Sequence, residues 1–380
     1  MQTIIEYYKH LKTVTPFVKR YPNYDLHDKK VHVLYVNPKL RSEEYYSSIL
    51  PALELNKTTT HTCILSSIEL EPSSEDFFDY VDRLDVRLLK WANYIVFPTI
   101  LTDITYLVKV LRLLHPHLQI VMHLDRNYHK TPPWHKQYEK VNSTVKNQLI
   151  TNINMLDICI CQNESLEKQY RSAVEFYFKD VKCHLTTMPT LISRISIENL
   201  EPTGKNESKI SNIGVFNPSE NFLKLIPILV KNLEKKGHNI SYIIFDYKGD
   251  QSLYTNQSTI IFFKRESFLN YFQELLNLQL TIALFNVSEY SKYDPAHYYL
   301  EASAIGIPSI VCKEHPIASI VKDKEAGLLV LKDSDWETHI TTLLEKEIFR
   351  KQLALHSMKI VWKDHSFTRK SLKKITSIFV

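Results

Sequence analysis

The sequence predicts an α/β protein made of two doubly wound, Rossmann-like domains. Its 380 residues exceed what one hydrophobic core usually organises, so two domains are expected. Short apolar runs alternate with helical patterns through both halves, which favours parallel strands joined by right-handed crossovers. The alternation stops once, over residues 193–209, where Pro, Gly, Asn and charged residues replace it. We therefore expect an N-terminal domain over residues 1–192, a linker over 193–209 and a C-terminal domain over 210–365.

In the first half, the expected strands are short runs rich in Val, Ile and aromatic residues, and the expected helices are longer and amphipathic. A helix and a loop are expected before the first strand, over residues 1–28. The strands expected in this half are 31–36, 62–68, 92–97, 118–123, 158–161 and 184–188. The helices expected between them are 43–55, 82–91, 103–114, 141–155 and 164–178, with Asp103 capping the third.

The second half repeats this alternation. Its expected strands are 210–216, 241–245, 259–263, 280–285, 309–311 and 327–330. Its expected helices are 219–236, 267–276, 294–304, 335–346 and 349–362, followed by an amphipathic tail over 366–379. Each half therefore supplies the strands and helices of one open parallel sheet.

The composition excludes several classes of function. A net charge of +5 is too small to make nucleic acid the main partner, and it favours only weak attraction to anionic membranes or phosphorylated ligands. No run approaches the ~18 apolar residues that span a bilayer, and the N-terminus lacks a signal-peptide pattern. The five cysteines show no disulfide or metal spacing. We expect a cytoplasmic protein that associates peripherally with the inner membrane face.

Glycine is scarce and unevenly placed. There are six glycines, and the first is Gly204. The first half therefore contains no dinucleotide fingerprint, no P-loop and no kinase loop. A nucleotide ligand must be held by the second half, which indicates an acceptor domain followed by a donor domain.

Residues 293–330 carry the most informative pattern. Asp294 suits a helix N-cap and Pro295 the first helical position, while Gly306 can take the left-handed conformation that ends the helix. A helix start at a sheet edge offers N–H groups and a positive partial charge to a diphosphate. Glu301, two turns into the helix, could accept hydrogen bonds from sugar hydroxyls.

This segment resembles a known family. The run Tyr-Leu-Glu-Ala-Ser-Ala-Ile-Gly-Ile-Pro over 299–308, followed by Ala-Gly-Leu-Leu-Val over 326–330, is similar to the donor-binding segment of GT-B glycosyltransferases. The resemblance is to the retaining family 4 group, also called glycosyl transferases group 1. It implies two Rossmann-like domains with an interdomain cleft. It also implies a final helix, over 366–380, that packs back on the N-terminal domain.

The resemblance assigns donor-binding roles to this helix. The glutamate that aligns with Glu301 holds the ribose of the nucleotide, and a second glutamate eight residues earlier contacts the donor sugar. In this sequence that earlier position is Tyr293, and Asp294 is the nearest acid, so the donor motif is degenerate. His297 lies one turn before Glu301, where it contacts phosphate or sugar, or else packs beside Tyr298.

The diphosphate also needs positive charge or helix-end amides. The family implies an Arg and a Lys after the first strand of the second domain, whereas residues 216–220 of this chain read Phe-Asn-Pro-Ser-Glu. Gly214 remains as a donor-binding candidate there. Lys264 and Arg265 are the best substitute on the same carboxyl edge, and their alternative is a solvated loop pair.

His123 and Asp125 are the catalytic candidates. His123 ends an expected strand, and ligands of doubly wound sheets bind outside the carboxyl ends of the strands. The imidazole could orient the acceptor or bind the donor sugar, with Asp125 fixing its tautomer or acting itself. The alternative is a histidine that is satisfied by backbone groups at the end of a strand.

No metal site and no cofactor are expected. His123, His129 and His135 are spaced by six residues, which fits neither a helical face nor a compact loop site. Asp333 and Asp335 form an Asp-x-Asp pattern, which an acidic helix start explains without a metal. A nucleotide-sugar would be a substrate.

The function expected from these residues and from the resemblance is glycosyl transfer. A nucleotide-sugar would donate to a polysaccharide, lipid-linked or protein acceptor, and the resemblance implies retention without an essential metal. A second hypothesis is a catalytically inactive GT-B-fold binding or scaffold partner of a transferase, which the degenerate motif and the missing Arg favour. A third, a sugar-nucleotide epimerase, needs more acid–base groups than the sequence offers.

Overall fold

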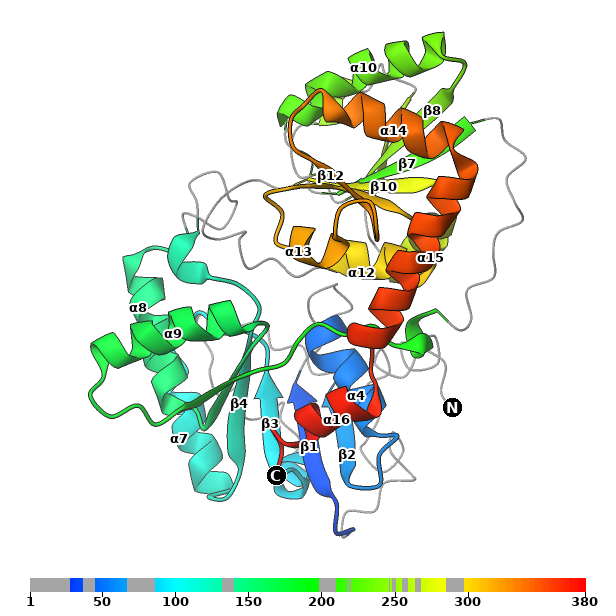
Figure 1. The fold of residues 1–380 in the computed structure, drawn as a ribbon. Helices are drawn as coiled ribbons and strands as arrows, with labels where there is room; N and C mark the ends of the chain where they lie inside the picture. Colours follow the sequence, from blue (N-terminus) through cyan, green and yellow to red (C-terminus); the bar gives the residue numbers. More distant parts are fainter. Residues whose placement is uncertain are drawn as a thin grey trace. The chain divides into compact units, whose positions relative to one another are not determined.

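The computed structural model divides the chain into two compact units (Figure 1). One comprises Met1–Ile195 together with Phe367–Val380, and the other comprises Ser196–Ser366. The structure describes residues 28–36, 45–66, 86–131, 140–197, 210–216, 218, 220–245, 247, 251–254, 259–263, 268–284 and 297–380. The expected N-terminal helix lies outside these residues.

The first unit is built on a six-stranded sheet. Its strands are β1 (Val31–Val36), β2 (His61–Ser66), β3 (Tyr94–Phe97), β4 (Gln119–Leu124), β5 (Ile158–Cys161) and β6 (His184–Thr187). They lie in the order β2-β1-β3-β4-β5-β6, and every neighbouring pair is parallel. Parallel neighbours need crossover connections, which explains the alternation of helices and strands in the sequence.

Helices connect these strands. They are η1 (Tyr45–Ile49), α4 (Leu50–Leu55), α6 (Val86–Trp91), α7 (Thr105–Leu114), η2 (Tyr128–Lys130), α8 (Ser143–Met155) and α9 (Glu164–Tyr177). Asn142 and Asn163 cap α8 and α9, because their side-chain oxygens accept the backbone N–H groups of Val145 and Leu166. Asp103 was expected to cap α7, but the N-cap is Ile104, and Asp103, one residue earlier, accepts the N–H of Thr105 at 2.8 Å.

The end of the chain belongs to the first unit. Its helix α16 (Arg369–Thr376) packs against α4. The ring of His61 donates to the carbonyl of Phe379 at 2.9 Å, and the hydroxyl of Tyr94 donates to the carbonyl of Val380. Both donors are the first residues of strands, so the last residues of the chain bind to the amino edge of the sheet.

The second unit is also built on a six-stranded parallel sheet. Its strands are β7 (Ile210–Phe216), β8 (Asn239–Phe245), β9 (Ile260–Phe263), β10 (Leu280–Ala283), β11 (Ser309–Cys312) and β12 (Leu328–Val330). The strand order is β12-β11-β10-β7-β8-β9, and every neighbouring pair is parallel. From β7 the chain builds the sheet outward through β8 to β9. It then returns to the other side of β7 with β10, so the order of strands reverses between β7 and β10. That reversal is the switch point at which open α/β sheets bind their ligands.

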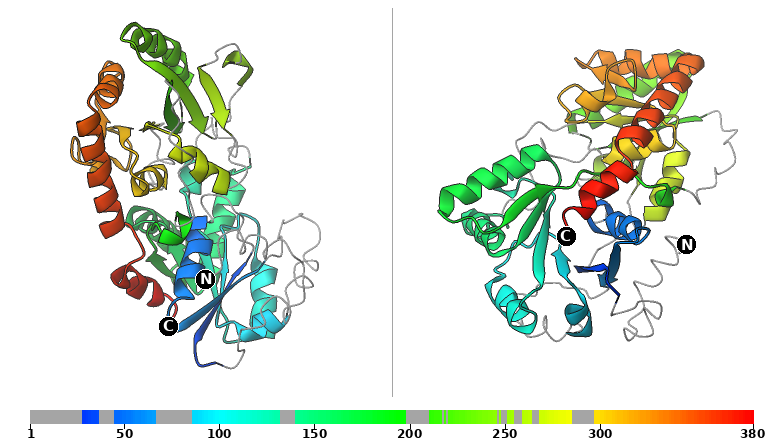
Figure 2. Two further views of the ribbon diagram at one scale, coloured as in Figure 1. Left: turned by 90° about the vertical axis from the view of Figure 1, so that its right-hand side faces the viewer. Right: turned by 60° about the horizontal axis from the view of Figure 1, so that its bottom comes forward.

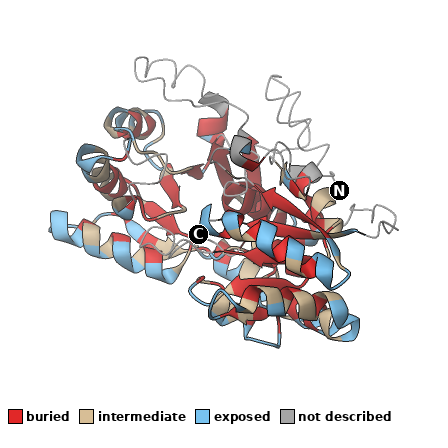
Figure 3. Ribbon diagram, turned by 90° about the horizontal axis from the view of Figure 1, so that it is seen from above, coloured by how far each residue is buried: buried red, intermediate tan, exposed pale blue. Residues whose placement is uncertain are grey.

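Helices lie on both faces of this sheet (Figures 1 and 2). They are α10 (Glu220–Lys235), α11 (Phe268–Leu276), α12 (His297–Ala304), α13 (Ala318–Val321), α14 (Asp335–Glu345) and α15 (Glu347–Asp364). α10 and α14 pack together over one face, and α12 lies over the other, where it also contacts α15. The strands between them are largely buried (Figure 3), and their apolar side chains form the core with those of α10 and α14.

The end of α12 follows the sequence expectation. Gly306 has a φ of +77°, and Gly306 and Ile307 donate their N–H groups to the carbonyls of Ser303 and Ala302. These two bonds form the Schellman motif that left-handed glycines allow. The indole of Trp362 on α15 donates to the carbonyl of Ala304 at 3.1 Å, so a neighbouring helix satisfies another carbonyl at the helix end.

The structure differs from the sequence expectation in two helices. The expected helix 43–55 is a π-helical turn at Tyr45–Ile49 that leads into α4. Pro51, near the start of α4, has no N–H to donate, so the regular pattern is interrupted there. α13 was not expected, because four residues are too short to show helical periodicity.

Candidate functional site

The structure brings His123 and Asp125 together at the carboxyl end of β4. His123 is the next-to-last residue of the strand and is buried, and Asp125 follows it directly outside the strand. The hydroxyl of Thr99 lies 2.7 Å from the His123 carbonyl oxygen and 3.0 Å from Oδ1 of Asp125. The Thr99 hydroxyl therefore links the backbone of β4 at His123 with the Asp125 carboxylate, and the His123 imidazole takes no part in these two contacts.

His123 and Asp125 have different electrostatic surroundings. Burial lowers the pKa of His123 to about 4, although the nearby Asp125 acts in the opposite direction. The imidazole is therefore neutral near pH 7, where it can donate one hydrogen bond and accept another. Asp125 accepts a hydrogen bond from Tyr128 at 3.0 Å and lies 3.5 Å from Nε of Arg126. This arrangement suits a positioning carboxylate beside a neutral histidine.

In the second unit, Glu301 lies in the interior. It sits on α12 with an exposed fraction of 0%, and the hydroxyl of Tyr271 on α11 donates to its Oε2 at 2.5 Å. The sequence pattern favoured a carboxylate facing a ligand, whereas the structure gives that carboxylate a protein partner. Binding of a ribose by Glu301 stays a prediction, and it requires Tyr271 to share or release the carboxylate.

Aromatic rings fill the carboxyl ends of β7 and β8. Phe216, the last residue of β7, stacks on Phe245, the last of β8, with ring centroids 4.7 Å apart. Tyr298 on α12 also stacks on Phe216, at 4.5 Å, and Tyr271 meets Phe216 and Phe245 edge-on. The carboxyl end of β7 is therefore packed among aromatic rings.

Gly214 has a structural reason to be glycine. It lies inside β7, where an added Cβ would sit 2.5 Å from Cδ1 of Leu278 and 3.2 Å from the ring of Phe245. Close packing between the strand and its neighbours explains the residue without a ligand. Contact of Gly214 with a diphosphate stays a prediction.

Of the remaining donor-binding candidates, the structure describes only His297. His297 is the first described residue of α12 and is buried on the same helix as Glu301. Asp294, Lys264 and Arg265 lie outside the described residues. Their roles, like that of His297, stay predictions.

Sequence reasoning missed Tyr271, Thr99 and Tyr128. Tyr271 lies 30 residues from Glu301 on a different helix, and only the helical periodicity of both segments signalled that they turn inward. Thr99 and Tyr128 follow β3 and β4, so the rule that parallel strands end at one edge could have found them.

No metal centre is evident in the part of the chain that the structure describes. It contains no group of three or more His, Cys, Asp or Glu side chains that could hold a metal ion. Asp335 accepts the N–H groups of Leu331 and Lys332, at 3.1 and 3.2 Å, which accounts for one acid of the Asp-x-Asp pattern. All five cysteines are thiols, and burial raises the pKa of Cys63 and Cys183.

No protein-family model and no curated protein matches the sequence. Solved structures do match. Anabaena HepE, crystallised with UDP and glucose, aligns with a TM-score of 0.60 over 92% of this chain and 99% of HepE, at 11% identity. A glycosyltransferase from Rickettsia africae ESF-5 aligns with a TM-score of 0.59 over 93% of this chain and 98% of that protein, at 15% identity.

The chain has a GT-B-like fold. The expected fold class is thereby confirmed, because two six-stranded Rossmann-like units match these structures over almost their whole length. S. aureus TarM, in complex with fondaparinux, alpha-GlcNAc-glycerol and UDP, also has this fold. It aligns with a TM-score of 0.51 over 75% of this chain, at 12% identity, and the chain spans only 55% of TarM. The structural alignments establish the GT-B fold. Sequence identities of 11–15% assign no activity to this chain.

Proposed function

We propose that this protein is a glycosyltransferase that moves a sugar from a nucleotide-sugar to a glycan, lipid-linked or protein acceptor. The observation that carries the proposal is the GT-B-like fold, matched over nearly all of both chains by a protein crystallised with UDP and glucose. The sequence similarity of residues 299–308 and 326–330 to the retaining family 4 donor segment supports the same conclusion.

In this proposal the second unit holds the nucleotide. The switch point between β7 and β10 is where an open sheet of this order binds its ligand, and α12 packs beside it. Glu301 binds the ribose once Tyr271 shares the carboxylate, and His297 and Asp294 lie toward the diphosphate. Lys264 and Arg265 supply the positive charge that the missing Arg would give.

The first unit would bind the acceptor. His123 and Asp125 stand at the carboxyl end of β4, with the Thr99 hydroxyl between them. A neutral imidazole can accept a proton from an acceptor hydroxyl, and Asp125 stabilises the charge that develops. The proposed reaction retains the anomeric configuration and needs no metal.

The cationic face of α16 supports peripheral association with a membrane. Arg369, Lys370, Lys373 and Lys374 are exposed on it, and no carboxylate of the described residues pairs with them. Each such charge near an anionic lipid surface contributes ~1 kcal/mol. None of the described helices combines the length and the apolar character that crossing a bilayer requires.

One observation favours a second candidate, a catalytically inactive binding partner with this fold. The Glu301 carboxylate is already bonded to Tyr271, and aromatic rings occupy the ends of β7 and β8. A protein that no longer binds nucleotide would be free to fill its switch point in this way.

Nucleotide release separates the two candidates. Purified protein is incubated with UDP-glucose, GDP-mannose or dTDP-glucose, with and without a panel of oligosaccharide and glycolipid acceptors. The transferase proposal predicts release of nucleoside diphosphate with one donor, and only when an acceptor is present. Absence of release with every pair, in a protein that stays folded, contradicts the transferase and favours the inactive partner.

A further inference from the structure

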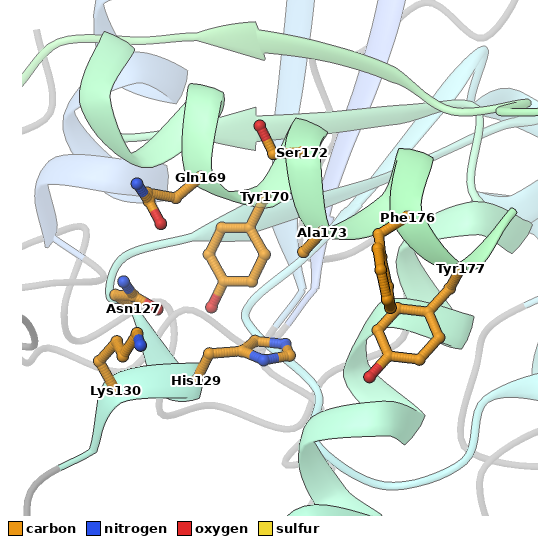
Figure 4. Close-up of a pocket in the computed structure, with 9 residues that line it drawn as sticks. All are labelled: Asn127, His129, Lys130, Gln169, Tyr170, Ser172, Ala173, Phe176 and Tyr177. Carbon is orange, nitrogen blue, oxygen red and sulfur yellow. The ribbon is translucent and has the colours of Figure 1, made fainter.

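A surface pocket in the first unit lies beside the segment that follows β4, and neither His123 nor Asp125 lines it. It lies between η2 and α9 (Figure 4) and has a volume of about 350 Å³. The residues that line it are Asn127, His129, Lys130, Gln169, Tyr170, Ser172, Ala173, Phe176 and Tyr177. Nothing in the proposed transfer reaction uses these side chains.

Two polar side chains, Asn127 and His129, lie at the floor of the pocket. Asn127 is only 3% exposed, yet it lines the pocket. Nε2 of His129 is buried, and none of the described residues forms a hydrogen bond with it. Burial lowers the pKa of His129, and Lys146 and Lys130 lower it further, so the imidazole is neutral near pH 7. Buried polar atoms are normally paired, and a ligand hydroxyl can supply the partner that the described residues do not.

The walls of the pocket are aromatic. The hydroxyl of Tyr170 is already used, because it donates to the Arg126 carbonyl at 2.9 Å and accepts the N–H of Tyr128 at 3.1 Å. The Tyr170 side chain is 1% exposed, so its ring forms the back of the pocket. Phe176 is 83% exposed and Tyr177 is 53% exposed, and their rings pack edge-to-face with centroids 5.2 Å apart. Figure 4 shows the ring of His129, which comes from η2, pointing toward these two rings.

This combination fits a sugar ring. A pyranose has C–H faces that pack on aromatic rings and a rim of hydroxyl groups that need donors and acceptors. Asn127 and His129 can bond those hydroxyls from the floor, and Gln169, Ser172 and Lys130 can bond them from the rim. A pocket of about 350 Å³ is at the small end of the usual range for ligand sites, and it has room for one or two sugar rings.

The surroundings disfavour a phosphate ligand. Lys130 is the single cation among the lining residues. The residues contributed by α9 lie between Gln169 and Tyr177, beyond its first turn, so the helix offers no unpaired N–H groups to an anion there. A neutral, hydroxyl-rich ligand suits the site better than an anion.

We propose that this pocket binds a sugar residue of a glycan through side chains other than His123 and Asp125. Such a site would hold a longer glycan on the first unit while another part of it is modified. It would serve the same purpose in a protein without transferase activity, so the inference does not depend on the proposed function.

The test is glycan binding in the absence of any nucleotide. The full chain is applied to an array of oligosaccharides that end in glucose, galactose, mannose, N-acetylglucosamine or glucuronic acid. The affinity for a retained glycan is then measured by calorimetry. Phe176→Ala removes an exposed stacking ring, and Ala173→Trp fills the pocket. Leu113→Ala is the matched control, because Leu113 is 81% exposed on α7 of the same unit.

We expect the wild-type chain to bind at least one array glycan. Phe176→Ala should weaken that binding about tenfold and Ala173→Trp should abolish it, whereas Leu113→Ala should leave it unchanged. The proposal is overturned if the wild-type chain binds no glycan of the array. It is also overturned if Phe176→Ala and Ala173→Trp both bind the glycan as tightly as the wild-type chain does. Binding that survives Phe176→Ala but disappears in about 0.5 M NaCl also overturns it, since that result indicates a surface charge alone. Nucleotide-sugar binding is scored separately, so failure of the transferase proposal leaves this result unaffected.

Discussion

The hydroxyl of Tyr271 donates a hydrogen bond to the carboxylate of Glu301, at 2.5 Å, in the interior of the second unit. Both side chains are fully buried, and they come from two helices, α11 and α12, that flank the ends of β7 and β10. The carboxylate that the sequence pattern assigns to a nucleotide therefore also holds two elements of the protein together.

Tyr271→Phe should destabilise the second unit. It leaves a buried carboxylate without one of its donors, which lowers the free energy of unfolding by about 1–3 kcal/mol. Urea unfolding followed by circular dichroism measures the change. Tyr177→Phe is the control, because its hydroxyl makes only an exposed 3.3 Å contact with Asn147. Equal stability of the two variants would show that the Tyr271 bond contributes nothing.

His123 should make the stability of the first unit depend on pH. Its pKa is about 4 in the folded chain, because of burial, against an ordinary value of 6.5. Between these values the unfolded chain binds a proton that the folded chain does not, so stability is complete above pH 6.5 and falls as the pH is lowered toward 4. The loss at about pH 5 is about 2 kcal/mol.

The His123→Gln variant tests this dependence. Its urea midpoint should change less than that of the wild-type chain between about pH 7.5 and about pH 5. His184→Gln, at an exposed position in β6, should retain the wild-type dependence. His315, whose pKa burial also lowers to about 4, leaves a residual dependence in both variants. An unchanged profile in His123→Gln would contradict the account.

Gly214→Ala should be destabilising through packing. The added Cβ approaches Cδ1 of Leu278 to 2.5 Å, so the expected loss is about 1–3 kcal/mol. Adding Leu278→Ala should relieve part of this clash, and a double-mutant cycle from urea unfolding measures the coupling. Strictly additive losses would indicate that Leu278 is not the cause.

The cationic face of α16 should bind anionic membranes. Sedimentation with vesicles of phosphatidylcholine containing about 30% phosphatidylglycerol should retain the wild-type chain at low salt. Lys370→Glu with Lys373→Glu should lower the partition coefficient at least about tenfold. Lys231→Glu with Lys235→Glu on α10 changes the net charge equally and should have little effect. Equal losses in both pairs would show that net charge, and not α16, decides.

Much of the fold follows from local patterns. The apolar runs at β1, β5 and β7 gave their strands with the correct bounds, and the alternation with helices required parallel sheets. Gly306 was assigned its role correctly, because a left-handed helix end depends on neighbouring residues only. The start of α7 was predicted one residue too early, at Asp103 in place of Ile104.

The candidate site was less accessible to sequence reasoning. The bond between Tyr271 and Glu301 joins different helices, and no periodicity says which buried side chains of two helices meet. The packing that requires glycine at position 214 depends on Leu278, 64 positions later. The sequence alone therefore does not distinguish Gly214 from any other glycine. The sheet-edge rule did bring His123 and Asp125 to one place, because it depends on topology and not on side-chain partners.

The central claim is that the second unit binds a nucleotide-sugar through Glu301. Titration calorimetry with UDP-glucose, GDP-mannose and dTDP-glucose tests it most directly, using the wild-type chain, Glu301→Gln and Glu345→Gln. Glu301→Gln keeps an acceptor for Tyr271, and Glu345 is an exposed glutamate at the end of α14. We predict that one nucleotide-sugar binds the wild-type chain and Glu345→Gln equally and binds Glu301→Gln at least about tenfold more weakly. Binding of none of the three, or equal binding by Glu301→Gln, would contradict the claim.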